Sequence, residues 1–199
     1  MNLPIYPYGH FYSPIVDTDD VLSRSETIWE ARSTIKGINF NAEKQLEILD
    51  SWFPEFVSEY DYPDHGGATK PSGFFNLNDQ FGWLDSRALF VLMRKLRPAR
   101  FVEVGSGFSS LLVADVNHRF LDEKIEFTCI EPYPREFLKQ GVTGLTRLLE
   151  TKVQDVAPEL FLQLEAGDVL FIDSSHVAKT GSDVLHLFLK FCRISSQGY

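Results

Sequence analysis

Short apolar runs alternate with helical patterns through the second half of the chain. Four runs have the length and composition of strands in a parallel sheet, and they lie near residues 100–104, 125–130, 146–149 and 168–172. Segments with helical periodicity or turn signals separate them, at residues 109–120, 134–140 and 158–164. Because strands that alternate with helices form parallel sheets, the pattern predicts a Rossmann-like, doubly wound α/β fold.

The N-terminal part of the chain has weaker periodicity. Residues 1–40 are rich in Pro, Tyr, Asp and Ser, which is typical of a segment that wraps around a domain. Asn41 is expected to cap an amphipathic helix that ends at Pro54. The turn-forming residues 61–73 then predict a boundary. We therefore expect an arm with helices that pack on a main domain, with the two parts spanning residues 1–73 and 74–199.

A further helix is expected just before the first strand. Asp85 can cap it, and five apolar residues then recur on one face: Ala88, Leu89, Leu92, Met93 and Leu96. Arg94 and Lys95 suit the C-terminal end of the helix dipole, and Pro98 leads into the strand.

Composition and charge narrow the class of protein. The 199 residues, 44% of them apolar, can form one substantial core. The net charge of −9 argues against a nucleic-acid partner or an anionic membrane surface. The apolar runs are too short to span a membrane and the N-terminus lacks a signal region, so a cytoplasmic protein is expected. Cys129 and Cys192 lie in apolar patterns typical of buried free thiols.

A glycine turn follows the first predicted strand, in the pattern Glu103-Val104-Gly105-Ser106-Gly107. Ser109 or Ser110 is expected to start the next helix. A dinucleotide-binding turn would have a third glycine where this chain has Ser110. Glu103 is an unfavourable neighbour for a pyrophosphate but suits an ammonium or sulfonium cation. The turn therefore favours a cationic ligand over the nicotinamide cofactor of an oxidoreductase, which remains the weaker alternative.

Polar residues end the other predicted strands, and in such a sheet these ends converge on one crevice. Glu131 lies 26 residues after Gly105, near the spacing expected of a carboxylate that binds ribose hydroxyls. Asp155, next to Gln154, can accept from an adenine amino group. Glu131 could instead be a solvated strand-end carboxylate, and Asp155 could be a helix cap or turn residue before Pro158.

Several motifs in the same order resemble a bacterial family of uncharacterised class I S-adenosylmethionine-dependent methyltransferases. They are Tyr12-Ser13-Pro14, Glu103-Val104-Gly105-Ser106-Gly107, Ile130-Glu131-Pro132-Tyr133-Pro134, Val153-Gln154-Asp155-Val156 and Phe171-Ile172-Asp173-Ser174-Ser175-His176. The resemblance implies that S-adenosylmethionine binds at Glu103, Gly105, Ser106, Gly107, Glu131, Gln154, Asp155 and Asp173. It leaves the acceptor open, and we expect methyl transfer to an oxygen or nitrogen of a small molecule or glycan.

Asp173 and His176 are the candidate catalytic residues at the end of the fourth strand. His176 could act as a general base towards a hydroxyl acceptor. In related metal-dependent O-methyltransferases an acidic residue in the place of Asp173 binds a divalent cation, with His176 as a candidate second ligand, although a metal is not expected here. Alternatively, Asp173 positions the methionyl part of the cofactor and His176 forms a hydrogen bond within a loop.

The resemblance also implies further strands beyond the fourth, which residues 191–199 do not supply. The expected sheet, of order 3-2-1-4, is therefore C-terminally incomplete, and the run 169–172 lies at its edge. An apolar edge strand invites pairing with a second copy, so self-association is expected. An inactive cofactor-binding remnant or an interaction module is the non-enzymatic alternative.

Overall fold

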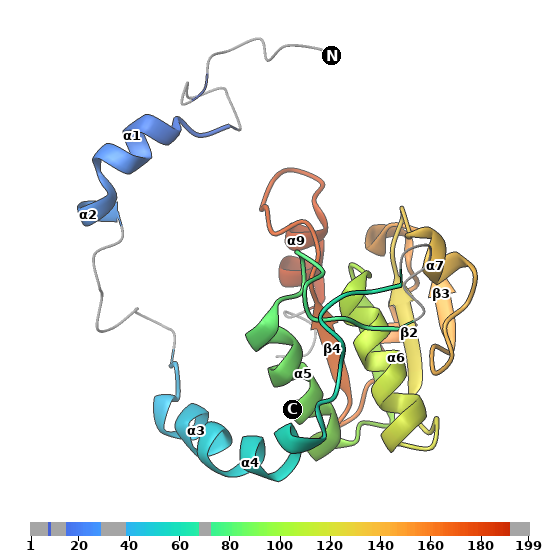
Figure 1. Cartoon of the computed structure of the whole chain (residues 1–199). Coiled ribbons are helices and arrows are strands. Elements are labelled where there is room, and N and C mark those ends of the chain that lie inside the picture. The colour runs from blue at the N-terminus through green and yellow to red at the C-terminus, as the bar shows by residue number, and fades with distance from the viewer. Residues whose placement is uncertain (1–7, 9–14, 29–38, 68–72, 192–199) are drawn as a thin grey trace. The chain divides into compact units, whose positions relative to one another are not determined.

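The computed structural model describes residue 8 and residues 15–28, 39–67 and 73–191 (Figure 1). The chain divides into two compact units, Met1–Ala42 and Glu43–Tyr199. The first contains α1 (Thr18–Ser23) and α2 (Ser25–Ile28). The division lies at residue 42, whereas the turn-forming residues placed the expected boundary at residue 73. Residues 43–59 belong to the second unit because their helices pack on α5.

The second unit is built on a four-stranded parallel sheet of order β3-β2-β1-β4. Its strands are β1 (Arg100–Val104), β2 (Glu126–Ile130), β3 (Arg147–Leu149) and β4 (Val169–Ile172). β1 is central, with Val104 opposite Ile130 on one side and Ile172 on the other. The doubly wound α/β fold and the strand order expected from the sequence are both confirmed.

Helices pack on the sheet or on α5, and most of them lie in the segments that the sequence predicted. They are α3 (Ala42–Glu47), α4 (Phe53–Phe56), α5 (Trp83–Leu96), α6 (Phe108–Phe120), α7 (Glu136–Lys139), α8 (Glu159–Leu162) and α9 (Asp183–His186). π-helical turns span Ile48–Trp52 and Leu187–Phe191, and 3-10 turns span Val57–Glu59 and Val153–Asp155. Among the described residues, none of the helices combines the length and apolar character that crossing a bilayer requires.

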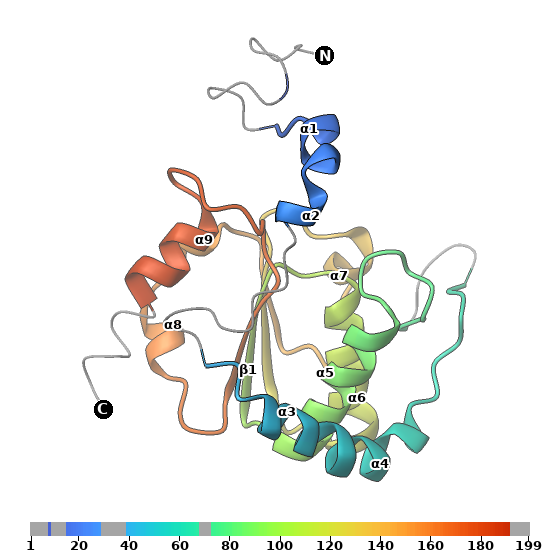
Figure 2. The same ribbon diagram turned by 90° about the vertical axis from the view of Figure 1, so that its left-hand side faces the viewer.

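The helices form a layer on each face of the sheet. Figure 2 shows α5 and α6 on one side of the strands and α8 and α9 on the other. The larger core lies beneath α5 and α6 and is rich in aromatic residues, including the fully buried Phe90, Phe101 and Phe127. The smaller core joins the opposite face of the sheet to Phe161 and Leu187. Both faces of β1 are therefore covered, which suits the buried apolar residues Phe101, Val102 and Val104.

Two helix starts differ from the sequence prediction. α6 begins at Phe108 with Gly107 as its cap, so Ser109 and Ser110 lie inside its first turn. α5 begins at Trp83 with Gly82 as its cap, which places Asp85 in the first turn rather than before it. In both cases a glycine precedes the helix, and on α6 the Ser110 hydroxyl accepts from the Gly107 amide from within the first turn.

The helical segment that was expected to end at Pro54 continues beyond it. Pro54 lacks an amide hydrogen, and it lies in the first turn of α4, immediately after the π-helical turn Ile48–Trp52. A proline is tolerated in a first helical turn because an amide there needs no partner within the helix. The change of helical pitch therefore lets the chain continue through Pro54.

Arg94 attaches this N-terminal helical segment to the main core. Its guanidinium lies over the rings of Phe56, Phe90 and Phe120, at 5.1, 5.5 and 4.1 Å from their centroids. Its Nη2 atom donates to Glu59 at 3.1 Å, and only 11% of its side chain is exposed. Rings from α4, α5 and α6 thus share one cation.

Two further expectations concern β4 and the cysteines. Within the described residues β4 pairs only with β1, so its place at the sheet edge is confirmed, while self-association through that edge stays a prediction. Cys129 is a buried free thiol, as expected. Cys192 lies outside the described residues.

Replacing Arg94 with Met should lower the free energy of unfolding by about 1–3 kcal/mol, because the variant loses the ring contacts and the ion pair with Glu59. Lys95→Met is the matched control, since Lys95 pairs with Glu55 at the surface. It should cost less than about 1 kcal/mol. Urea denaturation measures both values, and equal losses would contradict the role of Arg94.

Candidate functional site

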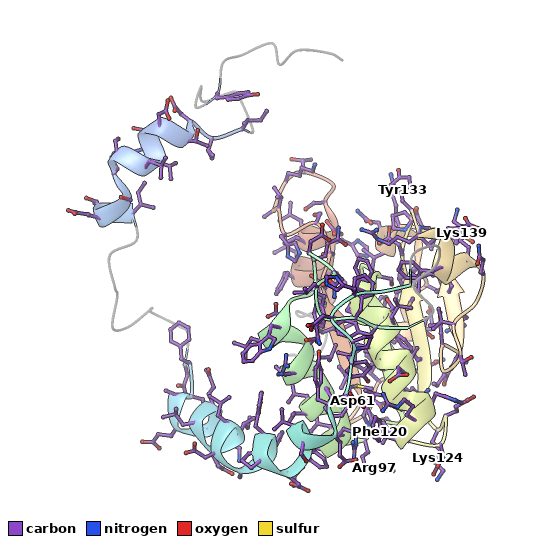
Figure 3. The ribbon with its side chains drawn as sticks, viewed as in Figure 1. Asp61, Arg97, Phe120, Lys124, Tyr133 and Lys139 are labelled. Carbon is purple, nitrogen blue, oxygen red and sulfur yellow. The ribbon has the colours of Figure 1, made fainter. Side chains whose placement is uncertain are left out.

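A cavity of about 740 Å³ lies over the carboxyl ends of β1, β2 and β4. It is lined by the glycine turn, by Glu131 and the residues after it, by the 3-10 turn at Val153, and by the loop that follows Asp173. Figure 3 labels Tyr133 at this end of the sheet, whereas Arg97 and Lys124 lie at the opposite end. The crevice expected from the topology is therefore open and large enough for a nucleoside-sized ligand.

Gly105 follows β1 and lies against the backbone of Asp173, the residue that follows β4. Its φ is +84°, and a Cβ atom there would lie 1.9 Å from the carbonyl oxygen of Asp173. The amide of Asp173 donates to the Val104 carbonyl at 2.9 Å, and the Gly105 amide donates to Ile130 at 3.0 Å. Only glycine fits this position, because both the backbone angle and the neighbouring carbonyl exclude a side chain.

Gly107 has a different role in the same turn. A Cβ atom there would meet no protein atom within 4 Å, although Gly107 lines the cavity. The missing side chain therefore leaves room for a ligand beside the main chain.

Glu131 is held by two backbone amides. Its Oε2 atom accepts from the Ser106 amide at 3.2 Å, and its Oε1 atom accepts from the Tyr133 amide at 2.8 Å. The carboxylate lines the cavity and each oxygen keeps lone pairs for another donor. This geometry fits the two hydroxyls of a ribose.

Glu103 lies behind the glycine turn, fully buried, and is not among the described residues that line the cavity. Its carboxyl accepts from the hydroxyls of Ser109 and Ser110, and the Cys129 thiol lies 3.3 Å away. Desolvation raises the pKa of Glu103 to about 7, against the lowering effect of the two serines. In this structure the side chain ties β1 to the first turn of α6 and does not reach the ligand space directly.

Ser110 completes this arrangement from the helix. Its Oγ atom accepts from the Gly107 amide at 3.0 Å while its hydroxyl donates to Glu103. The serine that replaces the third glycine of a dinucleotide turn is thus fully engaged with the protein.

Gln154 and Asp155 are placed differently from each other. Gln154 lines the cavity, and its Nε2 atom donates to the Gly181 carbonyl at 2.9 Å, across the loop that follows β4. Asp155 is exposed and is not among the described lining residues. Val153, which is buried, lines the cavity beside Gln154. A base-sized group would meet an apolar wall there.

Asp173 and His176 meet on the rim of the cavity. The His176 Nε2 atom lies 3.2 Å from Asp173 Oδ1, and 71% of the His176 side chain is exposed. His176 has a left-handed φ of 57°, which is uncommon outside glycine and points its ring back towards β4. Among the described residues, no group of three or more His, Cys, Asp or Glu side chains is arranged to hold a metal ion.

The cavity also contains residues that the sequence did not identify. Gln80 and Phe81 enter it from the segment before α5, where the buried Asn78 accepts from the Phe81 amide at 2.7 Å and shapes the turn. Arg135 Nη2 donates to Gln80 Oε1 at 2.7 Å and holds that segment against the start of α7. Nothing in the local sequence marks Gln80. Tyr133 and Lys152 could have been found from their position beside predicted site residues.

Comparisons with known proteins identify the family. A family model described as a methyltransferase domain matches residues 102–198. A protein of Archaeoglobus fulgidus described as uncharacterized is 39% identical over 165 residues, which cover 81% of this chain and 74% of the relative. No solved structure matches the chain. Together with the parallel sheet of order β3-β2-β1-β4, these findings show that the chain belongs to the class I S-adenosylmethionine-dependent methyltransferases.

The resemblance seen in the motifs is therefore confirmed at the level of the family, whose members take their methyl group from S-adenosylmethionine. The relative is archaeal, and a bacterial origin stays a prediction. The cytoplasmic location and the exclusion of nucleic acid and membrane also stay predictions.

Glu103→Gln should change how stability depends on pH. The raised pKa means that the folded state favours the protonated Glu103 carboxyl. The stability that this preference contributes is fully present below about pH 4.5 and is lost as the pH rises through about 7. A glutamine side chain does not ionise, so the variant does not lose stability in this way. The stability of the variant relative to the parent should therefore rise by about 3 kcal/mol between pH 4 and pH 8.

Denaturant unfolding at several pH values measures this difference. Glu159→Gln, at an exposed carboxyl on α8, is the control. If the stability difference from the parent depends on pH in the same way for both variants, Glu103 is not the source of the pH dependence.

Proposed function

We propose that this chain transfers the methyl group of S-adenosylmethionine to an oxygen or nitrogen of a small-molecule or glycan acceptor. The observation that carries the proposal is the Asp173–His176 pair, at 3.2 Å, on the rim of the cavity that also contains Glu131. A ribose-binding carboxylate and a candidate base thus face one space.

The cofactor end of the site is supported by the glycine turn and by Glu131. Gly107 leaves room for a ligand beside the backbone, and Glu131 is already oriented by the Ser106 and Tyr133 amides. When bound, S-adenosylmethionine supplies an electrophilic methyl group and a thioether leaving group. Because Glu131 does not need to reorient, little ordering free energy is lost on binding.

His176 would remove the acceptor proton. With a proton on Nε2, the ring donates to Asp173 and Nδ1 accepts the proton of an acceptor hydroxyl or amine. Asp173 holds the ring and stabilises the imidazolium that forms. The main requirement beyond this proton transfer is alignment of the acceptor with the methyl group, which Gln80, Phe81 and the loop after Asp173 would provide.

Glu131→Ala should weaken the binding of S-adenosylhomocysteine at least tenfold, because each charge-assisted hydrogen bond to the ribose is worth about 1.5–3 kcal/mol. Isothermal titration calorimetry measures the affinity. Glu136→Ala, at an exposed carboxyl on α7 outside the cavity, is the control and should bind like the parent. Unchanged affinity of the Glu131 variant would refute the ribose assignment.

His176→Ala should lower methyl transfer about 10²–10⁴-fold while changing the affinity for S-adenosylhomocysteine less than threefold. Radiolabelled S-adenosylmethionine with a panel of phenols, sugars and amines measures transfer. Asp173→Asn should lower transfer too, and His118→Ala, on an exposed residue of α6, is the control.

Three results would change the proposal. If both variants turn over like the parent, the pair only shapes the loop. Activity that is lost with a chelator and restored by Mg²⁺ or Mn²⁺ would assign Asp173 and His176 to a metal. Cofactor binding without transfer to any acceptor in the panel would favour a cofactor-binding remnant.

A further inference from the structure

A second cavity lies between α5 and β4, at the edge of the sheet. Its volume is about 490 Å³, and most of its lining is apolar, with Leu92 and Leu96 on α5 facing Val169 and Phe171 on β4. We call it the α5–β4 groove. It shares Gln80, Phe81 and Asp173 with the cofactor cavity, so the two spaces adjoin at the end of β4.

The groove has a polar end and an apolar end. Its described polar lining residues are Gln80, Asp85 and Asp173, which lie beside the first turn of α5 and the end of β4. From Asp85 the helix rises roughly 16 Å to Leu96. Ala88, Leu92 and Leu96 recur every four residues along this length, so they line one face of the helix.

The apolar end is accessible. Leu96 is 45% exposed, and Val169 and Phe171 are only partly buried. Met93, Leu89 and Phe101 form a buried floor. A hydrocarbon group in the groove would therefore exchange water for contacts with a preformed apolar surface.

Building on the proposed function, we propose that the α5–β4 groove binds the apolar part of the methyl acceptor. The acceptor is then an amphiphile: a hydrocarbon chain or ring lies along α5, and the adjoining hydroxyl or amine lies at Asp173 and His176. Asp173 supports this assignment because it lines both spaces. It stands at the polar end of the groove, and it contacts His176, the candidate base, on the rim of the cofactor cavity.

A second copy of the chain is the competing occupant. It would pair its own strand with the edge of β4 that has no partner strand among the described residues, and it would cover the same side chains. The residues that the groove shares with the cofactor cavity favour the acceptor, since a dimer contact has no need of Gln80 or Asp173.

Alkyl glucosides with six, eight and ten carbons, each below its micelle concentration, test the groove by calorimetry. The full chain is used with and without saturating S-adenosylhomocysteine. Each added methylene should raise the affinity up to about fourfold until the groove is filled. Alcohols of the same chain lengths test whether the sugar matters. If the acceptor is of the glycolipid type, each glucoside should bind more tightly than the alcohol of equal length, whereas a simple long-chain alcohol as acceptor predicts no gain from the sugar.

Leu96→Glu places a charge at the exposed apolar end of the groove and should weaken octyl glucoside binding at least tenfold. Leu162→Glu is the matched control, because Leu162 is also an exposed leucine, 62% accessible, but lies on α8. Both variants should bind S-adenosylhomocysteine like the parent. Circular dichroism checks that both are folded.

Affinity that does not depend on chain length, or that is equal in the two variants, would overturn the proposal. So would light scattering that shows a dimer of the parent which Leu96→Glu converts to a monomer, since the groove would then be an interface between copies. If S-adenosylhomocysteine does not bind the parent, the proposed function is refuted. Alkyl glucoside binding measured in the absence of S-adenosylhomocysteine tests the groove independently of that function.

Discussion

The close contact between the Gly105 main chain and the Asp173 carbonyl, where a Cβ atom would lie 1.9 Å from that oxygen, is the constraint on which the site depends. The amide of Asp173 continues the pairing of β4 with β1, so the first residue after β4 is tied to the last residue of β1. This contact sets how far the Asp173 side chain lies from the glycine turn. A side chain at position 105 would separate the strand ends and move the candidate base away from the cofactor space.

The buried Glu103 carboxyl supports the same turn from below. Burying a carboxyl is costly, and the hydroxyls of Ser109 and Ser110 offset part of that cost. The side chain therefore links β1 to the start of α6, while Ser110 holds the Gly107 amide. The turn is fixed on both sides: by Asp173 at Gly105 and by Ser110 at Gly107.

The loop that follows β4 connects the two halves of the cavity. The Ser175 amide and hydroxyl donate to Asp183, at the start of α9, and Gln154 donates to the Gly181 carbonyl. Burial would raise the pKa of Asp183, but hydrogen bonds from Ser175 lower it to about 2. The loop is thus anchored at both ends, with His176 between them. A group that binds near Gln154 would therefore act on the same loop that positions His176.

The sequence by itself determined the fold class and several of the residues at the carboxyl ends of the strands, whereas the strand order was expected from the resemblance to the methyltransferase family. Periodicity identified β1, β2 and β4 because they are short and mainly apolar, and topology places the ends of such strands together. Glu131, Gly105 and Asp173 could be predicted for this reason. Each lies at a strand end, and its position follows from local sequence alone.

Only the tertiary structure decided which side chains reach the cavity. Glu103 is adjacent to the turn in sequence, yet the alternation of side chains along β1 points it towards α6. Asp155 is exposed outside the lining, although Gln154 lies within it. Gln80 and Phe81 enter from a segment more than twenty residues before the glycine turn, and no local pattern marks them. Their position depends on how the segment before α5 packs across the sheet, which is a long-range property.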